Sequence, residues 1–197
     1  TEGYSFIDFI FGTEWLPSSK EFGIGAMIVT SMVATVGALI IGVPIGILAA
    51  IFIAEICPKK YARVISTAVE LLAGIPSVLY GIFGLAVIVP AIQTVLSLPK
   101  GQSLLAVIIV LAIMMLPTII SLSETSIRAV PKAYKEGSLA LGASKIETIF
   151  KVIVPAAKSG ILAGVILGIG RALGEATAVS MVAGNPSSGP NFHPFEA

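Results

Sequence analysis

Two charged residues, Arg171 and Glu175, interrupt an otherwise apolar stretch between residues 159 and 184. A guanidinium group presents its N–H donors in a rigid fork that matches the oxygens of an oxyanion. Side chains four residues apart on one helix can also pair along a common face. The sequence therefore predicts one of two arrangements. Either Arg171 binds a passing oxyanion while Glu175 holds the arginine in place, or the two residues form a structural ion pair.

This stretch is one of four that are long and apolar enough to cross a membrane, which takes about 20 residues. The other three, residues 24–53, 71–98 and 103–123, contain no charged side chain. Only 12% of the chain is charged, against about 25% in soluble domains. We therefore expect an all-α membrane protein with four transmembrane helices, surrounded by membrane lipid.

The basic residues fall on alternate sides of these stretches. Three lie between the first and second stretches and six between the third and fourth: Lys59, Lys60, Arg63, Arg128, Lys132, Lys135, Lys145, Lys151 and Lys158. Because Lys and Arg accumulate in cytoplasmic loops, both of these segments are expected in the cytoplasm. Both ends of the chain are then expected outside, in a multi-pass protein of the cell (inner) membrane.

Proline and glycine recur within the apolar stretches. Pro44, Pro76, Pro90 and Pro117 lie inside or at the edge of them, and broken helices are tolerated in lipid only where neighbours or a cavity satisfy the backbone. This favours a moving, multi-helix protein over a simple anchor.

Three glycines, Gly160, Gly164 and Gly168, repeat at every fourth position of the last stretch, and Gly42 and Gly46 repeat the spacing in the first. Glycines spaced in this way let another backbone approach closely. The pattern predicts close helix packing, either within the chain or at an interface with another subunit. Four spans are few for a complete pathway, so we expect a partner.

The long connection between the third and fourth stretches, residues 124–158, reads as ordered helix. Pro131 suits a first helical turn, and the good helix formers that follow end at Gly142, a natural left-handed stop. Ser144 and Glu147 then have the spacing of a capping box that begins a second helix. We expect a rigid helical elbow whose small-residue face fits a groove in another protein, or else a helix lying on the membrane.

Several functions are excluded by missing residues. A single cysteine, Cys57, and a single histidine, His193, cannot build a cysteine cluster or an H-E-x-x-H zinc site. The sequence contains neither G-x-S-x-G nor a P-loop, and it has no basic tract that would bind nucleic acid. We therefore expect a protein that is not an enzyme and binds no metal or cofactor of its own.

The elbow carries a resemblance to a known family. Glu136-Gly137-Ser138, then Gly142, then Val152-Ile153-Val154-Pro155 resemble the "EAA" loop of ABC importer permeases, with small-for-small and aliphatic-for-aliphatic exchanges. The resemblance implies a coupling helix that docks on a dimer of ATP-binding subunits, which would hold the ATP and Mg. The residues implied in coupling are Tyr134, Glu136, Gly137, Ser138, Ala140 and Gly142.

Residues 70–81 and 168–175 further resemble signatures of phosphate-specific permeases, and residues 178–185 resemble the PstC-type subunit. The resemblance implies a path for inorganic phosphate, a PstA-type permease partner and an extracytoplasmic phosphate-binding protein. Sulfate or molybdate as the substrate, or the PstA-type role for this chain, are the alternatives. Such permeases usually have six spans. Residues 1–197 are therefore expected to be one incomplete permease domain that lacks the first and last helices and includes the coupling loop.

Overall fold

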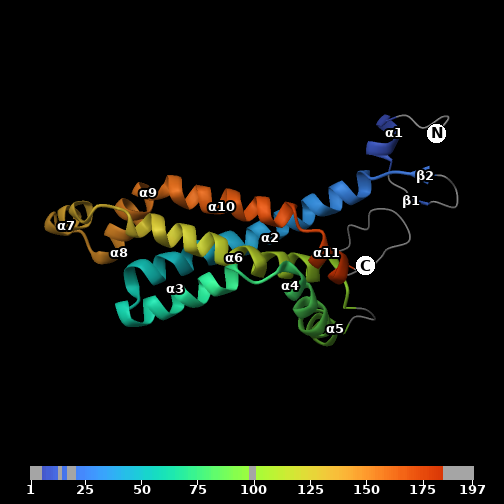
Figure 1. Ribbon diagram of the computed structural model, residues 1–197. Helices are drawn as coiled ribbons and strands as arrows, with labels where there is room; N and C mark the ends of the chain where they lie inside the picture. Colours follow the sequence, from blue (N-terminus) through green and yellow to red (C-terminus); the bar gives the residue numbers. More distant parts are fainter. Residues whose placement is uncertain (1–5, 13–14, 17–20, 98–100, 184–197) are drawn as a thin grey trace. The chain divides into compact units, whose positions relative to one another are not determined.

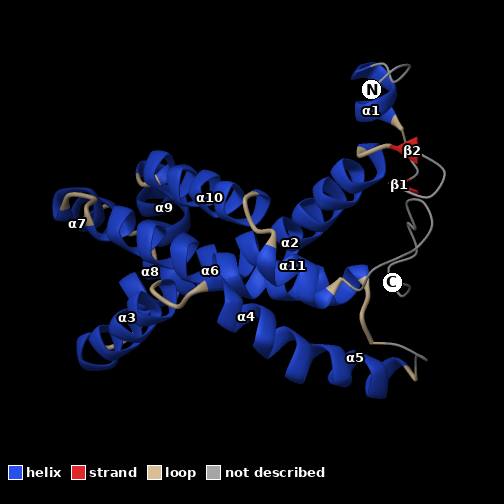
Figure 2. Ribbon diagram, turned by 45° about the vertical axis from the view of Figure 1, so that its right-hand side comes forward, coloured by secondary structure: helices blue, strands red, loops and turns tan. Residues whose placement is uncertain are grey.

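The fold of the chain was analysed in a computed structural model, which describes residues 6–12, 15–16, 21–97 and 101–183. Nearly all of these residues are helical (Figure 2). The predicted all-α class is thus confirmed, apart from two residue pairs that form the short antiparallel strands β1 (Trp15–Leu16) and β2 (Glu21–Phe22). His193 lies outside the described residues.

The helices follow one another along the chain as shown in Figure 1. In order they are α1 (Phe6–Phe11), α2 (Gly25–Ile51), η2 (Phe52–Ile56), α3 (Lys59–Ala73), α4 (Ser77–Phe83), η3 (Gly84–Ile88), α5 (Val89–Leu96), α6 (Leu104–Arg128), α7 (Lys132–Ala140), α8 (Lys145–Thr148), η4 (Ile149–Ile153), α9 (Val154–Ala156), α10 (Lys158–Leu173) and α11 (Thr177–Val182). The η segments are π-helices.

Three helical segments are long and apolar enough to cross a membrane: Gly25–Ile56, Ser77–Leu96 and Leu104–Arg128. A fourth crossing is possible if Lys145–Ala156 and Lys158–Leu173, which meet at a bend of 68°, form one span. The second predicted stretch therefore begins later than expected. Pro76 has no N–H to continue the preceding helix, so the chain breaks there, and α3 before the break is a separate amphipathic helix.

Each π-helical segment in the described part of the chain ends two residues before a proline: Pro58, Pro90 or Pro155. A proline ring clashes with the carbonyl one turn earlier and leaves a carbonyl without its donor. A wider turn with i→i+5 bonds gives the proline ring more room. Pro44 and Pro117, in contrast, lie within the continuous helices α2 and α6.

Two compact units emerge from the pattern of contacts, and each is described by itself. One contains Thr1–Ala38, Pro76–Leu111 and Leu173–Ala197, and the other contains Leu39–Ile75 and Ala112–Ala172. In the first unit α11 packs on α4 and η3. A Cβ on Gly81 would lie 3.0 Å from Cα of Ala178, so glycine there permits the close approach of the two helices.

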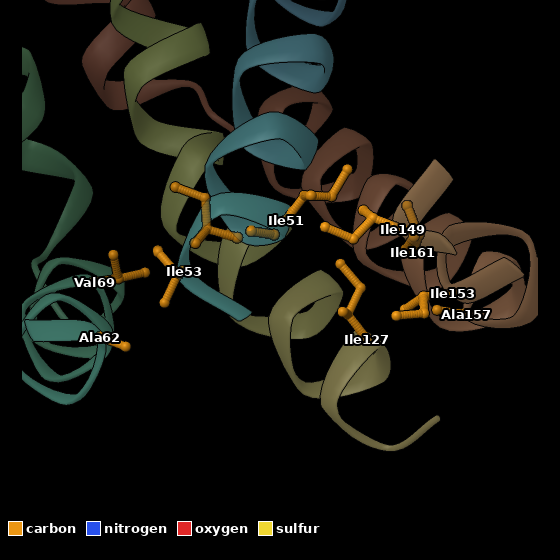
Figure 3. Close-up of a cluster of buried hydrophobic side chains, with 11 residues drawn as sticks. Ile51, Ile53, Ala62, Val69, Ile127, Ile149, Ile153, Ala157 and Ile161 are labelled. Atoms are coloured by element: carbon orange, nitrogen blue, oxygen red, sulfur yellow. The ribbon is translucent and has the colours of Figure 1, made fainter. Parts of the chain in front are cut away.

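The second unit has a continuous apolar core, shown in Figure 3. Its buried residues come from α2, η2, α3, α6, η4, the residue linking α9 to α10, and α10 itself: Ala50, Ile51, Ile53, Ala62, Val69, Ile120, Ile127, Ile149, Ile153, Ala157 and Ile161. Ile149 is fully buried and Ile127 is 2% exposed. This core holds together α3, α6 and α10, the three helices that contribute to the site described below.

Candidate functional site

Arg171 lies in the last turn of α10 and is half-buried within the second unit. Its Nη1 donates to the carbonyl oxygen of Ala73 at 3.3 Å and to Oγ1 of Thr118 at 3.4 Å. Ala73 is the last residue of α3, where carbonyls lack helical partners and the helix dipole favours a cation. The arginine thereby ties the end of α3 to α6 and α10.

The remaining donors of Arg171 are available for a ligand. Its Nε and Nη2 make no hydrogen bond to any residue that the structure describes. Two nitrogens on one edge of a guanidinium bind two oxygens of a carboxylate or phosphate side by side. The site can therefore hold an oxyanion while Nη1 keeps its protein contacts.

Glu175 does not share a helix with Arg171, because α10 ends at Leu173. The i,i+4 geometry predicted for the pair is therefore absent. The carboxylate of Glu175 instead accepts a hydrogen bond of 2.9 Å from the N–H of Ala178, in the first turn of α11. An acid at this position satisfies a backbone donor that a helix N-terminus leaves without a partner.

The glycines of the fourth stretch lie against α6. Beta carbons on Gly164 and Gly168 would lie 3.1 Å from Cβ of Leu122 and 3.0 Å from Cγ1 of Ile119, and Gly160 faces Ser126. Gly42 and Gly46 face Met115 and Ile119 of the same helix. The small residues thus let α2 and α10 both pack closely on α6 within this chain.

The predicted elbow between the third and fourth stretches is confirmed as a structure. Pro131 precedes α7, Gly142 has φ +87°, and Ser144 and Glu147 form a complete capping box. No residue of α7 is buried, and a Cβ on Gly137 would meet nothing within 4 Å. Among the residues implied in coupling, Tyr134 is 55% exposed, and Glu136, Ala140 and Gly142 are exposed as well. Ser138 is half-buried, and its hydroxyl pairs with that of Thr148 at 2.9 Å.

The capping box lowers the pKa of Glu147 from 4.5 to about 2. The backbone N–H of Ser144 is the largest cause, followed by Lys151, which donates to the carboxylate at 3.1 Å, and by the Ser144 hydroxyl. Because the folded pKa is depressed, this contribution to stability is present above pH 4.5 and is lost as the pH falls from there through about 2.

We expect a carboxyl NMR titration of Glu147 in the detergent-solubilised protein to show a midpoint of about 2. Substitution Lys151→Met should move that midpoint upward, because it removes both a charge and a hydrogen bond from the carboxylate. Lys145→Met is the matched control, since Lys145 makes no ion pair with a described residue. A wild-type midpoint near 4.5 would contradict the capping-box geometry.

A polar cluster beneath the elbow escaped the sequence analysis. Glu124 pairs with Arg128 at 2.8 Å and accepts from the Ser66 hydroxyl at 2.7 Å, while Glu55 pairs with Lys135. The i,i+4 spacing of Glu124 and Arg128 was a signal that could have been used. The contacts with Ser66 and between Glu55 and Lys135 join residues 58 and 80 positions apart, so no local pattern reveals them.

Comparison with known proteins places this geometry among transport proteins. The family described as "binding-protein-dependent transport system inner membrane component" matches residues 42–191. A probable ABC transporter permease, YqgH of Bacillus subtilis, is 46% identical over 93% of this chain and 60% of its own length. The phosphate transport system permease PstC of Mesorhizobium japonicum is 39% identical over 94% of this chain and 62% of its own. The chain thus spans about three fifths of the length of these relatives.

The fold also resembles a solved transporter. Inward-facing structures of the MetNI methionine ABC transporter contain a chain that matches with a TM-score of 0.57 and 23% identity. The match covers 77% of this chain and 68% of that one. It supports the helical arrangement, and at this identity it carries no information about substrate.

Proposed function

Because this chain belongs to the family of binding-protein-dependent transport system inner membrane components, we propose that it is part of a PstC-type permease subunit of an ATP-driven importer for inorganic phosphate. The observation that carries the substrate class is Arg171, held by one nitrogen and with Nε and Nη2 bonded to no described residue. An oxyanion is the ligand that such a fork recognises. The relatives named for phosphate support phosphate among the oxyanions.

The proposed topology has four crossings with both ends of the chain outside. Three of the crossings are the long apolar helices, and the fourth is the predicted stretch that contains α10, the second helix of the bent pair. The basic residues in the first turns of α3, and those from Arg128 at the end of α6 to Lys158 at the start of α10, then face the cytoplasm. Arg171 belongs to α10 and contacts α6. In this arrangement α7 lies at the cytoplasmic ends of these two helices.

In the proposed transport path, Arg171 binds phosphate as it passes, and Thr118 and the Ala73 carbonyl orient the guanidinium. Glu175, the second charged residue predicted for the path, would repel the anion and so favour its release. We propose that the path is completed by a PstA-type permease subunit. Phosphate would be delivered to it by an extracytoplasmic binding protein.

Coupling to ATP is assigned to the elbow. The exposed surface of α7 includes an aromatic ring, Tyr134, and a stretch without side-chain bulk at Gly137. Aromatic side chains are frequent anchors at protein interfaces. We propose that α7 docks in a groove of a separate ATP-binding subunit, which holds ATP and Mg and does the hydrolysis.

This docking predicts an effect for Tyr134. Tyr134→Ala is expected to weaken binding of the ATP-binding subunit by about 2 kcal/mol, or about 30-fold, as for a central aromatic anchor. The affinity is measured by titrating the subunit onto the full-length permease in nanodiscs. Tyr61→Ala is the matched control, since Tyr61 is similarly exposed, at 60%, but lies on α3. Equal losses for the two variants would argue against α7 as the docking helix.

The function as a whole is tested by ATP-dependent uptake. The full-length protein is reconstituted in vesicles with its partner permease, ATP-binding subunits and binding protein, and uptake of radiolabelled phosphate is compared with uptake of sulfate and molybdate. Phosphate uptake that needs hydrolysable ATP supports the proposal. Uptake of sulfate or molybdate without phosphate would keep the permease function and overturn the substrate, and no uptake of any oxyanion would overturn both.

A further inference from the structure

The helix α7 is joined to a part of the chain far from it in sequence. Lys135 of α7 donates to the carboxylate of Glu55, which belongs to the π-helical end of the first span. The side chain of Glu55 is only 10% exposed, and that of Lys135 is 36% exposed. A carboxylate this far from solvent is costly unless a cation lies beside it. The pair therefore holds α7 against η2.

The same helix end is held on another side by Arg128. In a π-helix the carbonyl of Ile53 would accept from residue 58, but Pro58 has no N–H. Nη2 of Arg128 supplies the missing donor at 3.2 Å, while its Nε binds Glu124, whose side chain is 9% exposed. Ser66 of α3 donates to the same carboxylate oxygen. An ion pair to α7 and a hydrogen bond from Arg128 of α6 thus hold the end of the first span, and Ser66 connects α6 to α3.

Packing holds α7 only at its surface, because no residue of that helix is buried, and its neighbours in space are η4 and α8, which follow it in the chain. Among the described residues, the side chains of α7 make two polar contacts with other segments, the Lys135–Glu55 pair and the Ser138–Thr148 hydrogen bond. The hydrogen bond leads to α8 and onward along the chain to α10. Among the described residues, the ion pair is the direct side-chain link from α7 to η2, whereas the route through η4 reaches η2 indirectly, by way of the apolar core that Ile149 and Ile153 share with Ile53.

We propose that the Glu55–Lys135 pair transmits displacement of α7 to the first membrane-spanning helix, which makes both of them positioning residues for energy coupling. The inference rests on the proposed function, in which α7 docks on the ATP-binding subunit. A displacement of α7 needs a rigid connection in order to move a helix that is not its neighbour in sequence. The pair offers a direct connection from α7 to η2, in addition to the indirect one through η4 and the apolar core.

The test measures phosphate uptake and ATP hydrolysis in the same vesicles, with the full-length protein in the complete importer. Lys135→Glu and Glu55→Lys each place two like charges together and are expected to lower the number of phosphates moved per ATP by about tenfold. The exchanged double variant, Lys135→Glu with Glu55→Lys, restores the pair and is expected to return the ratio to within about twofold of wild type. A purely structural loss of protein would lower uptake and hydrolysis together and leave the ratio unchanged.

Lys60→Met is the matched control, since Lys60 is an exposed lysine of α3, outside the proposed docking helix, and forms no ion pair with any described residue. If the charge-reversed variants do not assemble, Glu55→Gln and Lys135→Met replace them. The number of phosphates moved per ATP is measured for these variants in the same way. Single variants with an unchanged ratio, or a double variant that is not restored, would overturn the proposal. It is also overturned if Lys135 variants lose the ATP-binding subunit on co-purification. A wild-type importer that moves no phosphate would instead refute the proposed function.

Discussion

Replacing Arg171 with glutamine is expected to lower ATP-dependent phosphate uptake by about 10- to 100-fold, while the importer still assembles and still hydrolyses ATP. Hydrogen bonds to a charged partner contribute about 1.5–3 kcal/mol each, and glutamine keeps the polarity of the site but neither the charge nor the fork. Nε and Nη2 of Arg171, which bond to no described residue, are the groups that the substitution removes from the path. The measurement is initial uptake in vesicles, with hydrolysis followed in parallel.

Two further variants separate binding from structure. Arg171→Lys keeps the charge and loses the paired donors, so its uptake should fall between wild type and glutamine. Arg63→Gln removes an exposed arginine from α3 and should leave uptake unchanged. Arg171 also donates a hydrogen bond to Ala73 at the end of α3. If the role of Arg171 is purely structural, the variants should behave differently. Glutamine would then impair assembly, and lysine would restore assembly and uptake together.

Adding one methyl group at Gly160 is expected to lower the apparent stability of the solubilised protein by about 1–3 kcal/mol, the range for overpacking a well-packed site. The new Cβ would lie 2.5 Å from Cβ of Ser126, closer than two carbons approach, as well as on its hydroxyl. Rotating the hydroxyl relieves one contact but not the other, so α10 must move away from α6. Thermal unfolding in detergent measures the change in stability.

The same helix supplies the control for this prediction. A Cβ on Gly170 would meet nothing within 4 Å, so Gly170→Ala should be neutral or stabilising, as alanine favours the helix. Ser126→Gly, introduced with Gly160→Ala, removes the contacting atoms and should recover most of the loss. If Gly160→Ala and Gly170→Ala behave alike, the close approach of α10 to α6 at Gly160 is wrong.

Local signals predicted the elbow well because its determinants lie within a few residues. Pro131 cannot continue a helix from before it, Gly142 takes the positive φ that other residues avoid, and Ser144 with Glu147 satisfies a helix start from its own side chains. Each of these choices is made by backbone chemistry without help from the rest of the chain. The coupling role of the elbow is a separate matter and stays a proposal.

The membrane charges were predicted less completely, because the periodicity of an apolar stretch does not show where its helix stops. The pairing of Arg171 with Glu175 assumed one continuous helix through residue 184, whereas α10 ends at Leu173. Beyond that end, Glu175 bonds the nearby N–H of Ala178. Arg171 donates hydrogen bonds to Ala73 and Thr118, which are 98 and 53 residues away in the sequence. Only the folded chain brings these residues together.

The π-helical turns before Pro90 and Pro155, which continue directly into α5 and α9, change how the faces of these helices must be compared among relatives. Each such turn holds about one residue more than an α-helical turn, so every later side chain is rotated by about 100° from where a regular helical wheel places it. In a relative that lacks one residue at such a turn, the helix would return to regular α-helical spacing. The proline would still follow the turn. A gap at either of these two places in a comparison of sequences would therefore mark a rotation of a helix face, with no loss of length from a loop.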